Sequence, residues 1–158
     1  FRLFSAQQRG IDLPDQDALW EWSVTEIEQF WESFWDFAGV KATQRGTRTL
    51  IDGDRMPGAQ FFPDARMNFA ENLLSRRDDT DALVFWAEDK VKRRMSWREL
   101  YDLVSRLRKA LLAIGVEPGD RVAGFVPNMP ETIVAMLATA SIGAIWTSCS
   151  PDFGHQAV

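Results

Sequence analysis

The stretch that decides the fold is RVAGFVPNMPETIVAMLATASIGAIWTSCSPDFG, residues 121–154. Residues 121–125 form an apolar run typical of a buried strand, and two prolines separate that run from an apolar helical stretch, residues 131–142. A glycine ends the helical stretch, and a second short strand, residues 144–147, leads into the polar loop at residues 148–154. The order strand, helix, strand predicts a βαβ unit and therefore a parallel sheet.

Two capping-box patterns upstream predict the starts of two amphipathic helices. Ser23 and Glu26 precede an aromatic stripe with helical spacing in residues 27–38, and Ser96 and Glu99 precede an apolar stripe that continues to Ile114. The aromatic stripe could be a binding surface. Packing against a larger body is the better explanation, because burial of each large apolar side chain contributes roughly 1.5–3 kcal/mol.

The other segments give weaker patterns. Residues 82–87 (ALVFWA) predict a strand and residues 67–74 a short helix, whereas residues 41–66 have the glycines and prolines of a loop. We expect residues 1–19 to be an extended lead-in. We expect residues 88–94, which include the basic run KVKRR, to form a solvated turn.

Together these elements predict an α/β fold in which helices flank part of a parallel sheet, preceded by an aromatic-rich helical cap. The charged run RRDDTD marks the expected domain boundary, so we assign residues 1–78 to the cap and residues 79–158 to the sheet domain. Three convincing strands are few, because sheets average about five or six. We therefore expect an incomplete domain that is a piece of a longer chain and has the rest of that chain as its partner.

Composition narrows the class of protein. The net charge of −5 gives no basic face for nucleic acid, and no run approaches the roughly 18 apolar residues of a membrane helix. The single cysteine, Cys149, excludes a disulfide framework and agrees with a cytoplasmic location. We interpret Cys149 as a small buried residue and the single histidine, His155, as a surface residue near a helix start.

The residues themselves carry little catalytic chemistry. There is no GxxxxGK[ST] or GxGxxG motif to hold a triphosphate, and no cluster of His, Cys or Asp has the spacing of metal ligands. Paired carboxylates such as Asp78 and Asp79 lie in charged turns, not in the buried setting of an acid–base pair. We therefore assign no catalytic residue and no metal ligand.

Residues 96–146 resemble the opening of the adenylate-forming synthetases, through GVEPGDRV at residues 115–122 and PNMPE at residues 127–131. Residues 23–40 and 57–74 resemble the N-terminal cap of the acetyl-CoA synthetase branch of that family. Within the branch, the sequences PGAQFFPDARMNFAENLL and SCSPDFG are most similar to those of its acetoacetate-activating subfamily. The resemblance covers nearly all of the chain from about residue 20.

This resemblance implies a two-step reaction. A carboxylic acid, here acetoacetate, and ATP with Mg²⁺ form an acyl-adenylate, and the thiol of coenzyme A then attacks it. The family's phosphate-binding loop is expected further along the chain and is absent here, so we predict that residues 1–158 alone are inactive.

The resemblance also implies a ligand site. The family's contacts to the nucleotide of coenzyme A map by position onto Ser150, Pro151 and Asp152, with Phe153 and Gly154 adjacent. Because the Asp152 carboxylate would repel a phosphate, contact through the backbone or the adenine edge is the better interpretation. The alternative is a plain turn in which Ser150 or Asp152 caps a helix that begins near Gly154.

Two alternatives for the function stay open at this point. The first is a ligase for another short acid such as acetate or propionate, because the pocket that selects the acid is expected outside this segment. The second is a non-catalytic interaction module that uses the stripe around Trp31 and Trp35.

Overall fold

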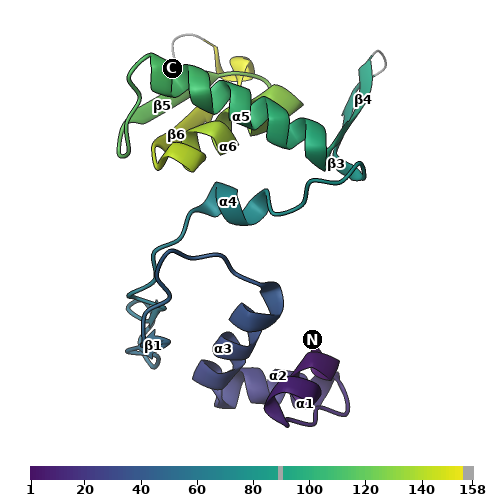
Figure 1. Ribbon diagram of the computed structural model, residues 1–158, viewed down its shortest axis with the longest axis vertical. Helices are drawn as coiled ribbons and strands as arrows, with labels where there is room; N and C mark the ends of the chain where they lie inside the picture. Colours follow the sequence, from purple (N-terminus) through teal and green to yellow (C-terminus); the bar gives the residue numbers. More distant parts are fainter. Residues whose placement is uncertain (89–90, 155–158) are drawn as a thin grey trace. The chain divides into compact units, whose positions relative to one another are not determined.

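The computed structural model describes residues 1–88 and 91–154, so the predicted position of His155 lies outside the described residues. The chain divides into two compact units, Phe1–Met67 and Asn68–Val158 (Figure 1). The predicted boundary between functional domains at residues 78 and 79 stays a prediction.

The first unit begins with two helices, α1 (Arg2–Arg9) and α2 (Gln16–Thr25). The expectation of an extended lead-in over residues 1–19 was therefore wrong. Helix α1 has no side-chain cap at its start, and Gly10 ends it in the left-handed conformation at φ 68°. Helix α2 is capped by Asp15, whose carboxylate accepts a backbone N–H at 2.8 Å.

The aromatic helix is α3 (Ile27–Ala38), as predicted, and Gly39 ends it at φ 61°. Its predicted capping box was wrong. The hydroxyls of Ser23 and Thr25 donate to carbonyls one turn earlier in α2, at 2.7 and 2.9 Å, and Glu26 joins the two helices without a side-chain cap. Hydroxyls inside a helix often bond back to the preceding turn, so the same residue types fit both settings.

The aromatic stripe packs within its own unit. The indoles of Trp22 and Trp35 are buried. The distance between ring centroids is 5.5 Å for Trp22 and Phe30 and 4.6 Å for Trp35 and Phe62. Most of residues 41–66 are loop, as predicted, apart from a small antiparallel pair made by β1 (Leu50–Ile51) and β2 (Gln60–Phe61).

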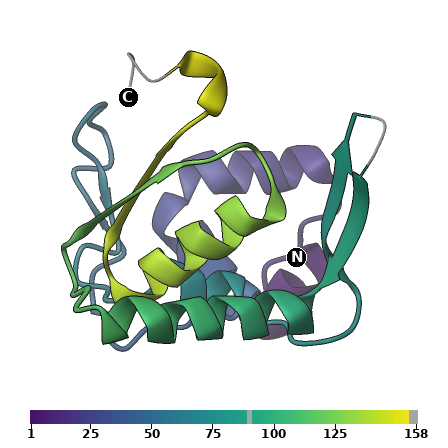
Figure 2. The same cartoon turned by 90° about the horizontal axis from the view of Figure 1, so that it is seen from above.

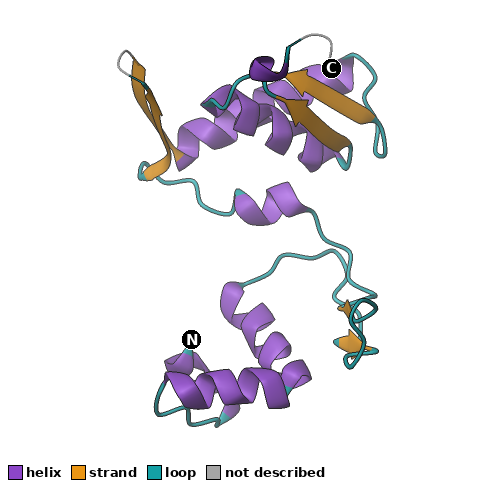
Figure 3. Cartoon of the chain, turned by 180° about the vertical axis from the view of Figure 1, so that it is seen from behind, coloured by secondary structure: helices purple, strands orange, loops and turns teal. Residues whose placement is uncertain are grey.

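The second unit contains the predicted βαβ element. Strands β5 (Arg121–Phe125) and β6 (Ile145–Cys149) are parallel, with Arg121 opposite Ile145, and α6 (Pro130–Ile142) joins them (Figure 3). Gly143 ends α6 at φ 88°, in the left-handed region. The second strand extends two residues beyond its predicted end, so Ser148 and Cys149 belong to the sheet and not to the loop.

Helices α4 (Phe69–Leu73) and α5 (Trp97–Ala113) complete the helical part of this unit. The predicted capping box at the start of α5 is confirmed: the Ser96 N–H donates to the Glu99 carboxylate at 2.8 Å, and the Glu99 N–H donates to the Ser96 hydroxyl at 3.2 Å. The predicted apolar face is also confirmed, except that Ile114 lies past the helix end and is exposed.

The basic run belongs to a strand. Strands β3 (Asp81–Ala87) and β4 (Val91–Ser96) form an antiparallel hairpin. The predicted turn over residues 88–94 was therefore wrong for residues 91–94, which belong to β4. Cross-strand partners stabilise the cations: Lys92 lies 4.3 Å from the centre of the Trp86 ring, and Arg94 pairs with an aspartate of β3. Among the described residues the strands form three two-stranded sheets, so β3 does not extend the parallel pair.

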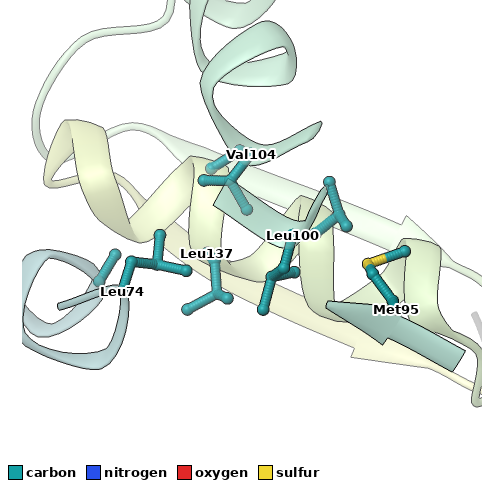
Figure 4. Packing of buried hydrophobic residues seen from close by; sticks show 8 residues of the cluster. Leu74, Met95, Leu100, Val104 and Leu137 are labelled. Atoms are coloured by element: carbon teal, nitrogen blue, oxygen red, sulfur yellow. The ribbon is translucent and has the colours of Figure 1, made fainter. Parts of the chain in front are cut away.

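The core of the second unit gathers side chains from four elements. Figure 4 shows Leu74, Met95, Leu100, Val104 and Leu137 converging between α4, β4, α5 and α6. Figure 2 shows α5 and α6 lying side by side. This packing fixes α6 and, through it, the two strands that it connects.

Candidate functional site

The candidate site lies where β5 and β6 end. Both strands are parallel and in register from end to end, with Phe125 opposite Cys149, so their carboxyl ends share one edge. The Val126 N–H donates to the Cys149 carbonyl at 3.1 Å, which joins the start of residues 126–129 to the last residue of β6. Ligands of open α/β sheets bind in the crevice beyond such an edge.

The predicted site residues form one tight turn. Residues Pro151–Phe153 are a single 3₁₀ turn, η1, which follows β6 directly (Figure 2). The Ser150 hydroxyl accepts the Asp152 N–H at 3.3 Å and donates to the Asp152 carboxylate at 2.8 Å. Ser150 therefore caps this turn, as the plain-turn alternative predicts, although the helix begins at Pro151 and not near Gly154.

The conformation of Gly154 requires glycine. Its φ of 69° and ψ of 159° lie in a region that is essentially closed to residues with a Cβ. A side chain there would cost roughly 1–3 kcal/mol in strain, even though the space around the Cβ position is open.

The turn can recognise a ligand in only some of the predicted ways. The N–H groups of Asp152, Phe153 and Gly154 already donate to Ser150 or Pro151 within the turn. They are therefore poor candidates for binding a phosphate. What the turn presents to solvent is the Phe153 ring, 69% exposed, and the Asp152 carboxylate. A ring and a hydrogen-bond acceptor suit a purine with an exocyclic amine.

One charged group at the same edge was not expected from the sequence. Glu131, in the first turn of α6, accepts a hydrogen bond from Arg93 of β4 at 2.7 Å. That bond is the main cause of a lowered pKa for the Glu131 carboxyl, so it stays ionised at the edge. A contact between residues so far apart in sequence has no local signal, since only the packing of the hairpin beside α6 brings them together.

The remaining residues of interest give no further chemistry. Cys149 is half-buried at the end of β6, so the prediction that it is buried holds only in part. Within residues 1–88 and 91–154 no group of three acidic, His or Cys side chains could hold a metal ion. No helix in that same part of the chain is long and apolar enough to cross a bilayer.

The first unit has one notable hollow. A pocket of about 370 Å³ lies between α3 and the β1–β2 region, and its lining is entirely apolar. Trp31 and Phe34 are partly exposed there, whereas Trp35 is buried. The pocket offers no acid, base or nucleophile. Its lining residues are Trp31, Phe34, Trp35, Val40, Phe61, Phe62 and Met67.

Comparisons with known families match both units. The family described as AMP-binding enzyme matches residues 69–158, and the family described as acetyl-coenzyme A synthetase N-terminus matches residues 16–73. The first match covers more than half of the chain and includes the whole βαβ element and the turn at residues 150–154.

Individual relatives extend these matches. The chain is 56% identical over 94% of its length to acetoacetyl-coenzyme A synthetase of Rhizobium meliloti, and covers 23% of that protein. It is 38% identical over 92% of its length to malonamoyl-CoA synthetase of Penicillium aethiopicum, covering 21% of it. The solved structure of acetoacetyl-CoA synthetase from Streptomyces lividans matches with a TM-score of 0.85 and 40% identity over 99% of this chain and 25% of that one. The chain thus spans about a quarter of the length of these relatives.

Proposed function

Because the chain belongs to the AMP-binding enzyme family, we propose that it is the N-terminal part of an acid–thiol ligase that joins acetoacetate to coenzyme A. The observation that carries the proposal is the 56% identity to an acetoacetyl-coenzyme A synthetase along 94% of the chain. Enzymes of this family use ATP and coenzyme A, and the proposal adds Mg²⁺, which would enter with ATP.

The proposed reaction has two steps. A carboxylate oxygen of the acid attacks the α-phosphorus of ATP, and the bond to pyrophosphate breaks. The thiol of coenzyme A then loses its proton and attacks the acyl carbon, and AMP leaves with the oxygen that came from the acid. Both steps depend on holding the reacting groups in line and on excluding water.

In this scheme residues 126–129 and 150–154 serve the second step. The turn at residues 150–154 would face the nucleotide of coenzyme A with the Phe153 ring and the Asp152 carboxylate, and residues 126–129 would line the other side of the site. Stacking of a base on an aromatic ring contributes about 1–3 kcal/mol. We propose Ser150, Pro151, Asp152, Phe153 and Gly154 as the residues of this subsite.

The names of the relatives support one class of acid. Acetoacetate and malonamate, the acids of the two named synthetases, both carry a carbonyl on the third carbon, and they differ only in a methyl against an amino group at its far side. We therefore propose a short 3-oxo acid as the substrate class, with acetoacetate as the member. The lone cysteine supports a cytoplasmic enzyme.

An acid panel tests the proposal. The enzyme expressed from its full reading frame should exchange pyrophosphate into ATP with acetoacetate, and at least about tenfold less well with acetate or propionate, since a site that hydrogen-bonds a carbonyl rejects acids without one. Malonamate serves as the control for shape. Faster exchange with acetate or propionate would favour the alternative short-acid ligase. No exchange with any acid, beside an intact fold, would favour a non-catalytic module.

A further inference from the structure

Asn68 joins two helices that are far apart in sequence. Its side-chain Oδ1 accepts the Glu71 N–H at 3.1 Å, which caps α4, and its Nδ2 donates to the Ala140 carbonyl of α6 at 2.8 Å. A backbone donor on one side and a backbone acceptor on the other fix which amide atom is oxygen and which is nitrogen. The side chain therefore acts as a cap and as a tether at once.

The tether holds α6 near its C-terminal end. Ala140 lies in the last turn of this helix, and the buried Ala70 and Leu74, in and just after α4, belong to the same apolar cluster as Leu137 of α6. Apolar contacts are not directional, so they oppose a small slide of the helix less sharply than a hydrogen bond does. The directional hydrogen bond from Asn68 opposes such a slide.

The other end of α6 is connected to the candidate site. The Thr132 hydroxyl donates to the Pro127 carbonyl at 2.7 Å, so residues 126–129 move with the first turn of the helix. The Val126 N–H in turn donates to Cys149, directly before Ser150. A helix of 13 residues is a rod of about 20 Å, so a shift at Ala140 reaches this edge undiminished.

A second contact holds α6 at its start, but it is the weaker one. The Arg93–Glu131 ion pair joins side chains that are 41% and 52% exposed. Exposed pairs of this kind contribute little and are screened by salt. The part-buried bond from Asn68 is therefore the stronger of these two side-chain contacts to the helix.

We propose that Asn68 is a positioning residue for the thioester-forming step: by fixing α6 it aligns residues 126–129 with the turn at residues 150–154 and so sets the affinity for coenzyme A. This inference rests on the proposed function. It places a determinant of coenzyme A binding at the first residue of the second unit, in a side chain that touches no reacting atom.

The test uses three variants of the enzyme expressed from its full reading frame. Asn68→Asp and Asn68→Ser both keep an oxygen that can cap α4, but the first has no donor for Ala140 when ionised and the second is too short to reach it. Ser96→Ala is the matched control, because it removes a cap of the same kind from α5, and the Ser96 side chain has no hydrogen bond to α6 in the described part of the chain.

Four measurements separate positioning from general damage. In both Asn68 variants we expect the KM and the calorimetric Kd for coenzyme A to rise about tenfold, since a small displacement of a binding group is enough for that. The rate of pyrophosphate exchange in the Asn68 variants should stay within about twofold of that of the unchanged enzyme. In Ser96→Ala the KM, the Kd and the rate of pyrophosphate exchange should all stay within the same range. Amide hydrogen exchange at residues 126–129 should become faster in the Asn68 variants only.

Two outcomes would overturn the proposal. If pyrophosphate exchange and coenzyme A binding are lost in parallel, Asn68 has only a structural role. If the Kd for coenzyme A is unchanged, the hydrogen bond from Asn68 to α6 does not affect the site. If Asn68→Asp fails to fold, Asn68→Ser decides by the same readouts. Absence of exchange in the unchanged enzyme would contradict the proposed function instead, and the Kd for coenzyme A would still test Asn68.

Discussion

Gly124, in the middle of β5, has no room for a side chain. A Cβ placed there would lie 2.6 and 3.0 Å from two carbons of the Trp146 six-membered ring and 3.2 Å from a methyl of Val126. Favourable carbon contacts lie at about 3.5–4.0 Å. The Trp146 ring, on the neighbouring strand β6, therefore packs directly over the bare backbone of Gly124.

The substitution Gly124→Ala should destabilise the second unit. Inserting a carbon into a packed site costs about 1–3 kcal/mol, and the lower chain entropy of alanine in the unfolded state offsets about 0.5–1 kcal/mol of this. We expect a net loss of about 1–2 kcal/mol. Amide hydrogen exchange in β5 and α6 measures it for this unit alone, because exchange reports local unfolding free energies.

A double-mutant cycle identifies the cause. In the Trp146→Phe background the outer ring carbons that meet the new Cβ are gone, so Gly124→Ala should cost about 1–2 kcal/mol less than in the unchanged chain. An equal cost in both backgrounds would refute the reasoning, because the cost would then come from the backbone and not from the Trp146 ring.

Three further predictions follow from single groups. Thr139 is fully buried, and its hydroxyl has no hydrogen-bond partner in the described part of the chain. Thr139→Val should therefore raise the unfolding free energy of this unit by about 1 kcal/mol, whereas Thr139→Ser should lower it. If urea unfolding shows that the valine variant is destabilised, the hydroxyl does have a hydrogen-bond partner and the reasoning is wrong. A hydrogen bond from the Ser96 N–H lowers the pKa of the Glu99 carboxyl below its ordinary value of 4.5. The ionised carboxylate therefore contributes its full stabilisation above pH 4.5, and this stabilisation is lost as the pH falls through the lowered pKa of the folded state. Glu99→Gln should make the stability of α5 less dependent on pH in this acidic range, and an unchanged pH dependence would contradict the prediction. Gly154→Ala should strain the turn after β6 and raise the Kd for coenzyme A several-fold while pyrophosphate exchange is kept, and calorimetry that finds an unchanged Kd would remove this turn from the site.

The sequence predicted those elements whose signals are local. The βαβ element has prolines before α6 and a left-handed Gly143 after it, and α5 has its complete capping box at Ser96. Helix α1 lacks both kinds of signal at its start, since Phe1 offers no capping oxygen. Strand β4 has four exposed residues in succession and no alternation, so only pairing with β3 makes it a strand.

The candidate site was predictable only in part. The order of strands places residues 150–154 at the carboxyl end of β6, and Ser150 is a recognisable capping residue. Residues 126–129, the Arg93–Glu131 pair and the tether from Asn68 depend on contacts across 23 to 72 residues. Such contacts follow from tertiary packing and have no pattern within a single segment.

The path of one oxygen atom tests the account most directly. With acetoacetate labelled with oxygen-18 in its carboxylate, the enzyme expressed from its full reading frame should transfer one labelled oxygen to AMP as acetoacetyl-CoA forms. That transfer requires an acyl-adenylate and a thiol that attacks its acyl carbon. Label in inorganic phosphate, or thioester formation without labelled AMP, would contradict the proposed ligase.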